Sequence, residues 1–275
     1  MRYWGLFFLF FLFTKTTIAA TDTIQVFSKA MQKDIKVVVV TPEKLKKKIL
    51  LPTVYLLHGY GGNYAQWVSH APQLQARANE LKMILVCPDG GYNSWYLNSP
   101  VDSTVRYESF CSQELVEYID EQYPTIKNKQ FRAITGLSMG GHGALYLAIK
   151  HTNVFGNAGS ICGGVDIRPF PKSWDLVKKL GDTICCKQNW EEHTVINVTN
   201  RLKNKELNLI IDCGVDDFFL SVNRNLHQKL LQMKIEHDYT ERPGGHNKAY
   251  WSNAINYQLY FFGMQFAKNK EQLAN

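Results

Sequence analysis

Short runs of mostly apolar residues recur along the chain, each about as long as one strand. Four of them, at 53–57, 83–87, 131–135 and 207–211, lead into turns that contain glycine. The strands of a parallel sheet covered on both faces have this pattern, because neither side of such a strand meets water. Two earlier β-rich runs, at 23–28 and 35–41, predict a hairpin that opens the fold.

Helical patterns occupy stretches between and after these strands, at 108–123, 141–150, 222–233 and 250–266. Strands that alternate with helices predict an α/β fold with a mostly parallel, doubly wound sheet and helices on both of its faces. Residues 167–204 interrupt the alternation, because they contain Pro169, Pro171, Trp174 and Trp190 but no clear strand. We expect this stretch to be a small insertion over one end of the sheet.

The first twenty residues have the pattern of a secretory signal peptide. Arg2 precedes an apolar run at 4–13, and the stretch ends in the small residues Ala19 and Ala20. The run is shorter than the roughly 20 residues of a membrane-spanning helix, so cleavage is favoured over an uncleaved anchor. We therefore expect an exported protein, secreted or periplasmic, with no stable membrane anchor after cleavage.

The remainder, 21–275, contains no repeat and no stretch that reads as a linker, so we expect it to form a single domain. The composition of the whole 275-residue sequence, 45% hydrophobic and 20% charged residues, is that of a globular protein with a substantial core. Lys and Arg number 31 against 24 Asp and Glu, but the excess is spread along the chain. The sequence shows neither a stripe of basic residues nor a recognisable nucleic-acid-binding motif, so a nucleic-acid partner is not expected.

The six cysteines are irregularly spaced and form no CxxC pair, so a structural zinc site is not expected. Cys87, Cys162 and Cys213 fall in apolar, strand-like runs and are expected to be buried. Cys185 and Cys186 are adjacent in a less regular stretch, where one of them could bridge to another cysteine.

A candidate nucleophile lies directly after the strand predicted at 131–135. Gly136-Leu137-Ser138-Met139-Gly140 matches G-x-S-x-G, and a small-residue helix follows it. This is the context of a nucleophile elbow, a strand-to-helix turn so tight that its flanking positions must lack bulky side chains. Such a turn exposes the serine hydroxyl at a helix N-terminus, where the helix dipole favours negative charge. Ser138 is therefore predicted to be catalytic.

A serine hydroxyl needs a base, and in this architecture an acid and then a histidine follow it along the chain. His246 lies in a glycine-rich turn between a strand-like run and the last helical pattern. The acid is expected just after the strand predicted at 207–211, where Asp216 and Asp217 both occur. We prefer Asp217, since the third residue after Gly214 is placed to turn toward the histidine, and Asp216 remains the alternative.

An oxyanion hole must donate two N–H bonds to the carbonyl oxygen as it becomes tetrahedral. One donor is predicted to be the backbone N–H of Met139, the residue after the nucleophile. The other is predicted to be the N–H of Tyr60, in the loop after the strand at 53–57, with Gly61 as the alternative. The glycines of this loop allow the backbone to approach the substrate, so Gly61 is also a candidate substrate contact.

Taken together, these stretches resemble the "Putative esterase" family of α/β-hydrolases, which contains S-formylglutathione hydrolases, feruloyl and acetyl esterases, and mycolyltransferases. The matching stretches are 56–62, 88–91 with 94–96, 136–143, 213–214 with 217–218, and 244–246. The resemblance implies the α/β-hydrolase fold, with Ser138 as nucleophile, His246 as base and Asp217 as acid. It also implies that neither a metal nor another cofactor is required. Asn247-Lys248 departs from the acidic or aromatic pair common after this histidine.

The expected substrate is an ester, and the expected reaction is hydrolysis through an acyl-enzyme. Trp67, Trp95 and Tyr96 are predicted, with Tyr92, to line the cleft and to stack on a sugar or a phenolic acyl group. We accordingly expect a carboxylesterase that removes acetyl or feruloyl groups from carbohydrate. The alternatives are acyl transfer, a thioesterase that acts on S-formylglutathione, and a non-catalytic carbohydrate-binding protein. The oligomeric state is not predictable from the sequence.

Overall fold

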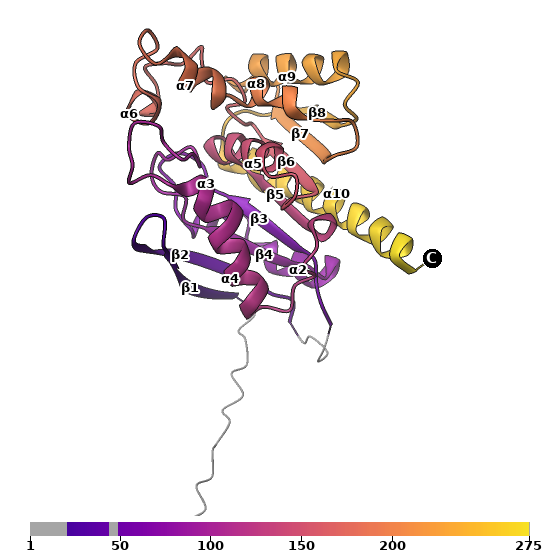
Figure 1. Ribbon diagram of the computed structural model, residues 1–275. Helices are drawn as coiled ribbons and strands as arrows, with labels where there is room; N and C mark the ends of the chain where they lie inside the picture. Colours follow the sequence, from indigo (N-terminus) through magenta and orange to yellow (C-terminus); the bar gives the residue numbers. More distant parts are fainter. Residues whose placement is uncertain (1–20, 44–48, 275) are drawn as a thin grey trace, which may run out of the picture.

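The computed structural model describes residues 21–43 and 49–274, so the predicted signal peptide lies outside the described residues. An eight-stranded sheet runs through this part of the chain in the order β1-β2-β4-β3-β5-β6-β7-β8 (Figure 1). The strands are β1 (Thr21–Ser28), β2 (Lys33–Val40), β3 (Thr53–Leu57), β4 (Ile84–Pro88), β5 (Arg132–Gly136), β6 (Asn157–Ile161), β7 (Asn208–Gly214) and β8 (Asp238–Arg242). β1 and β2 form the predicted antiparallel hairpin, β2 pairs antiparallel with β4, and all later pairs are parallel.

Helices cover both faces of the sheet, as predicted. The longer ones are α2 (Leu74–Leu81), α4 (Leu115–Gln122), α5 (Met139–Lys150), α9 (Leu220–Gln232) and α10 (Lys248–Ala274). Alternate side chains of β2, β3, β4 and β5 enter two separate apolar clusters. One cluster contains residues of α4, α5 and α9, and the other contains residues of α2 and α10. In Figure 1, α4 crosses in front of the sheet and α10 passes behind it. The fold is that of an α/β-hydrolase.

Two helices and one strand were not predicted from the sequence. α1 (Gln66–His70) and α2 were not expected, and neither was strand β6. β6 lacks an apolar run because its small residues admit a neighbouring helix. A Cβ at Gly159 would lie 2.2 Å from the side-chain oxygen of Gln258 on α10. The small residues of β6 meet the requirement of packing against α10. The segment therefore lacks the apolar run from which the other strands were predicted.

The predicted insertion contains only short helical segments. They are α6 (Leu176–Leu180), α7 (Lys187–Glu192), α8 (Val195–Val198) and the 3-10 turn at Thr199–Arg201. The predicted helix at 108–123 is α3 (Tyr107–Ser109), a π-helical turn (Phe110–Glu114) and α4 in succession. None of the described helices combines the length and the apolar character that crossing a bilayer requires.

Candidate active site

The turn between β5 and α5 holds Ser138 in a backbone conformation that few side-chain-bearing residues adopt, with φ 56° and ψ −118°. Its flanking glycines leave no room for a Cβ. A Cβ at Gly136 would lie 2.5 Å from the backbone of Gly140, and one at Gly140 would lie 2.3 Å from the carbonyl oxygen of Leu57. The G-x-S-x-G spacing is therefore a steric requirement of this turn, and the strained serine fits a functional position.

Three predicted side chains meet at the carboxyl ends of β5, β7 and β8, which share one edge of the parallel sheet. The Nε2 atom of His246 lies 2.9 Å from Ser138 Oγ. On the other side of the ring, Nδ1 lies 2.7 Å from Asp217 Oδ2. This arrangement can take a proton from the hydroxyl and hold the resulting imidazolium against a carboxylate.

Of the two candidate acids, only Asp217 reaches His246. Its side chain is buried, and its second oxygen accepts a hydrogen bond from the backbone N–H of Phe219 (2.8 Å). That bond fixes the rotation of the carboxylate. Asp216 is exposed.

Asp217 also controls the protonation of the imidazole. Burial by itself lowers the pKa of His246, but the hydrogen bond and the charge of Asp217, together with the contact of Cys162, act in the opposite direction. The net result raises the pKa of His246 to about 9. The pair therefore favours the imidazolium that forms when the serine proton is transferred.

The backbone N–H groups predicted as oxyanion donors differ in whether the fold already uses them. Among the described residues, none accepts a hydrogen bond from the backbone N–H of Tyr60 or of Met139. Gly61, the alternative donor, gives its N–H to the carbonyl oxygen of Tyr92 (2.8 Å), so it is committed elsewhere. Two N–H groups from different loops are thus available near Ser138.

His58 holds the loop of Tyr60 against its neighbour. Its Nε2 atom accepts a hydrogen bond from the N–H of Gly90, and its Nδ1 atom lies 2.7 Å from the carbonyl oxygen of Gly59. Because a carbonyl oxygen can only accept, the ring is neutral with its proton on Nδ1. This buried histidine joins the turns after β3 and β4 and takes no part in the serine relay.

The prediction that Trp67, Trp95 and Tyr96 line the cleft is wrong. Each is at most 1% exposed. The Trp67 indole donates to the carbonyl oxygen of Leu57, and the Tyr96 hydroxyl donates to that of His58. Trp95 Nε1 lies 3.3 Å from the carbonyl oxygen of Trp174. These rings are buried under the loops around Ser138 and cannot stack on a substrate.

Other aromatic residues surround His246 instead. The half-exposed Phe218 ring lies 4.3 Å from the imidazole, and Trp251 meets its edge at 5.1 Å. Trp174 of the insertion stacks on Phe218 at 5.7 Å. Phe218 follows the acid directly, and Trp251 lies in the first turn of α10, five residues after the base. This proximity in sequence is the signal that would have found them.

The insertion is tied to the loop of Tyr60 by one carboxylate. Asp175 Oδ2 accepts hydrogen bonds from the Tyr60 hydroxyl (2.9 Å) and from the Asn93 amide (3.0 Å). Lys178 lies 2.8 Å from its other oxygen. Trp174 and Asp175 both adopt left-handed backbone conformations, with φ 51° and 57°. We name the Tyr60–Asn93–Asp175 contact the insertion clasp.

One group of described residues has the donor atoms of a metal site. Ligand atoms of Cys162, Asp217 and His246 lie within 4.8 Å of one another. The His246 and Asp217 atoms are already joined by a hydrogen bond, which accounts for their proximity without an ion. That no metal is required therefore stays a prediction.

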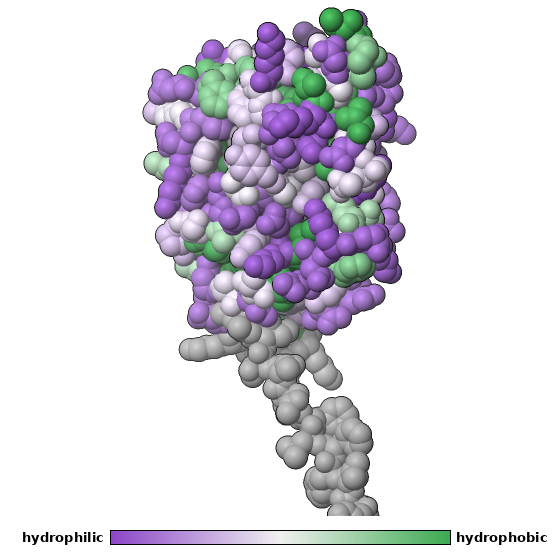
Figure 2. Space-filling view, turned by 90° about the vertical axis from the view of Figure 1, so that its left-hand side faces the viewer, coloured by the Kyte–Doolittle hydropathy of each residue, from purple (hydrophilic) through white to green (hydrophobic). Residues whose placement is uncertain are grey.

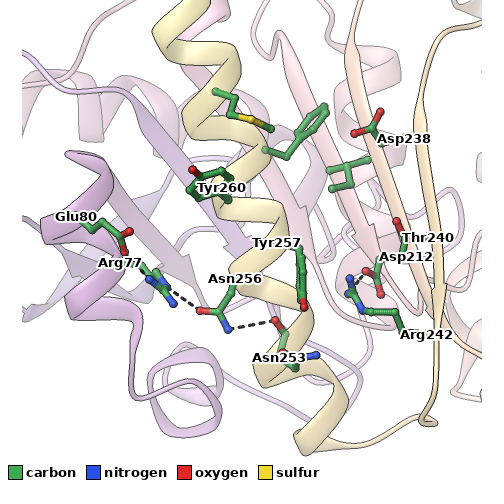
Figure 3. A pocket seen from close by; sticks show the side chains of 13 residues that line it. Arg77, Glu80, Asp212, Asp238, Thr240, Arg242, Asn253, Asn256, Tyr257 and Tyr260 are labelled. Atoms are coloured by element: carbon green, nitrogen blue, oxygen red, sulfur yellow. Dashed lines mark hydrogen bonds and ion pairs between the residues drawn. The ribbon is translucent and has the colours of Figure 1, made fainter.

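A cavity of about 640 Å³ lies elsewhere, around α2, α10 and β8 (Figure 3). Four of its five charged residues are paired: Arg77 with Glu80, and Arg242 with Asp212. Its lining includes none of Ser138, Asp217 and His246. This cavity is separate from the candidate active site.

Comparison with known proteins places this geometry in context. The sequence profile of the family described as "Putative esterase" matches residues 28–262. An acetyl esterase of Caldicellulosiruptor saccharolyticus is 28% identical over 255 residues, which cover 84% of this chain and 94% of the relative. An S-formylglutathione hydrolase of Mus musculus is 26% identical over 193 residues, which cover 62% of this chain and 66% of the relative.

Among solved structures, a ferulic acid esterase superposes with a TM-score of 0.77 at 26% sequence identity. The match covers 90% of this chain and 98% of that one. The likeness therefore extends over the sheet, the helices and most of the loops described above.

Proposed function

The chain belongs to the "Putative esterase" family and is a serine ester hydrolase, and on that premise we propose that Ser138, His246 and Asp217 form its catalytic triad. The observation that carries the proposal is the hydrogen-bonded relay at the strained turn, 2.9 Å from serine to imidazole and 2.7 Å from imidazole to carboxylate.

The mechanism follows from these positions. Ser138 Oγ attacks the ester carbonyl while His246 Nε2 accepts its proton, and Asp217 stabilises the imidazolium. The N–H groups of Tyr60 and Met139 receive the carbonyl oxygen as it becomes negative, a contribution of about 3 kcal/mol for each donor. The imidazolium then protonates the departing alcohol. Water activated by the same histidine hydrolyses the acyl-enzyme.

We propose further that the substrate is an acetyl or feruloyl ester of carbohydrate. The acetyl esterase relative and the ferulic acid esterase structure support these two acyl groups. The aromatic side chains around His246, namely Phe218, Trp174 and Trp251, offer flat surfaces for a phenolic ring. Export, implied by residues 1–20, would place the enzyme beside such polymers.

A panel of matched esters tests this assignment. The purified protein is assayed on acetyl, butyryl and feruloyl esters of one alcohol, on acetylated xylan and on S-formylglutathione. Higher kcat/KM on acetyl or feruloyl esters supports the proposal, and preference for S-formylglutathione favours the thioesterase. Added acceptor alcohol separates hydrolysis from acyl transfer through the products. N-terminal sequencing of the protein from its host tests cleavage near residue 20.

Activity is expected to rise with pH, because the base must be neutral to accept the serine proton. Contacts with Asp217 and Cys162 raise the pKa of His246 to about 9 against the lowering effect of burial. The neighbouring thiol adds no charge, since its hydrogen bond with Cys213 and its burial raise the pKa of Cys162. We therefore expect the midpoint of kcat/KM to lie above 6.5 and no higher than about 9. A profile measured from about pH 5 to about pH 10 that falls across this window would contradict it.

Asp175→Ala is expected to lower kcat/KM by about tenfold, mainly through kcat, because the insertion clasp orients the loop that carries the Tyr60 N–H. Tyr60→Phe keeps that N–H but removes the hydroxyl, so it should show a similar loss. The double variant should be no worse than Asp175→Ala, since that change already removes the hydrogen bond of the Tyr60 hydroxyl. Asp238→Ala, which removes an exposed carboxylate on β8, is the matched control. Additive losses would show that the two residues act independently.

A further inference from the structure

Only two of the six cysteines reach solvent. Cys87, Cys111, Cys162 and Cys213 are buried, whereas Cys185 is exposed and Cys186 is partly exposed. The exposed pair is adjacent in sequence, and the two Sγ atoms lie 2.9 Å apart. The expectation that one of them bridges to a different cysteine is not met, because all six are free thiols.

The backbone on both sides holds these two thiols together. The N–H of Cys186 donates to the carbonyl oxygen of Asp182, and the N–H of Asn189 donates to that of Cys186. The Cys186 thiol lies against Gly181, where a Cβ would be only 2.6 Å from the sulfur. Gly181 has φ +81°, so a side chain there is disfavoured by the backbone as well. The pair is therefore fixed at the start of α7.

The surroundings leave the pair open to small molecules. Ile184, directly before it, is 91% exposed. The side of the molecule that carries α6 and α7 faces the viewer in Figure 2, where hydrophobic residues at the upper edge lie among hydrophilic ones. Reagents in solution can thus reach Cys185 without any opening of the fold.

We propose that Cys185 and Cys186 form a redox-active dithiol site, which small disulfides convert into an intramolecular disulfide. One thiolate attacks glutathione disulfide, forms a mixed disulfide and releases one glutathione thiolate. The neighbouring thiol, after losing its proton, attacks the cysteine sulfur of that mixed disulfide and releases the second glutathione. The protein loses two electrons and two protons, and one glutathione disulfide becomes two glutathione thiols.

The ring that results is strained and therefore reversible. Adjacent Cα atoms across a trans peptide are about 3.8 Å apart, below the usual lower limit of about 4.4 Å for disulfide-linked residues. Strained and exposed disulfides are the easily reduced ones. The site therefore differs from a structural crosslink: mild thiols should open it. In its reduced form, two sulfurs at this separation suit a trivalent arsenical, which bonds to both.

Alkylation and intact-mass measurement test the proposal on the purified protein. After incubation with glutathione disulfide, the native wild type should lose two alkylatable thiols and keep no glutathionyl group, and glutathione should restore both thiols. Cys185→Ser and Cys186→Ser should each retain one glutathionyl group, because no neighbouring thiol is left to displace it. The double variant is the control, and it should show no reaction under native conditions.

Three results would overturn the proposal: stable glutathionyl groups on the wild type, covalent dimers of the chain, or thiols that stay reduced in wild type and single variants alike. A second measurement uses phenylarsine oxide, which should bind once to the reduced wild type and not to either single variant. The proposal does not depend on ester hydrolysis. Ser138→Ala protein should give the same thiol and arsenical results as the wild type.

Discussion

Ser138→Ala is expected to lower kcat/KM on the preferred ester by about 10⁴-fold or more, because it removes the hydroxyl that is hydrogen-bonded to His246 Nε2 and attacks the ester. Loss of the nucleophile leaves the oxyanion donors and substrate binding intact, so a small residual rate above water should remain. The change keeps a Cβ at the strained position, and thermal unfolding should therefore be nearly unchanged.

The control is Ser69→Ala, which removes an exposed hydroxyl on α1 and should leave the rate within about twofold of wild type. Labelling by a fluorophosphonate probe provides a readout that does not depend on the substrate. Wild type and Ser69→Ala should be labelled, and Ser138→Ala should not. A Ser138→Ala enzyme that keeps a tenth of the activity would exclude the proposed nucleophile.

Asp217→Asn is expected to cost about 10³- to 10⁴-fold in kcat. An amide in this position can donate to His246 Nδ1, which favours the ring tautomer whose proton lies on Nε2 and cannot accept the serine proton. Removing the carboxylate also removes the largest influence that raises the pKa of His246, so the lowering effect of burial is opposed only by the contact with Cys162. The midpoint of the residual pH profile should consequently move to lower pH.

Asp216→Asn is the matched control, one residue away and exposed. It should stay within about twofold of wild type, because its side chain lies outside the relay. Both variants are compared by steady-state kinetics over the same pH series, with circular dichroism to establish folding. Equal losses in the two variants would mean that the loop, and not the Asp217 carboxylate, supports the histidine.

The positions of Ser138, Asp217 and His246 could be predicted because each directly follows a strand. The carboxyl ends of parallel strands meet at one edge of a sheet, so chain order and turn composition were enough to bring the three together. The steric demand at Gly136 and Gly140 is likewise local, and the sequence displays it as G-x-S-x-G.

The aromatic residues could not be placed by the same reasoning. Trp67 and Tyr96 lie near the predicted loops in sequence, but their polar atoms bond to carbonyl oxygens at the end of β3 and just beyond it, which draws the rings inward. Strand β6 escaped notice because Gly159 accommodates Gln258, a residue 99 positions later. In both cases a distant partner decides the outcome, and no local pattern reports it.

The insertion clasp has a consequence for how such an enzyme can diverge. One carboxylate, Asp175, joins the segment that carries Trp174, which stacks on Phe218, to the loop that carries a proposed oxyanion donor, across 115 positions of sequence. Remodelling the insertion to admit a different acyl group would therefore disturb the turnover machinery as well. A substitution in the insertion that changes acyl selectivity is therefore expected to change the rate of catalysis too. An enzyme that evolves a new selectivity must restore its rate through compensating substitutions in the Tyr60 loop.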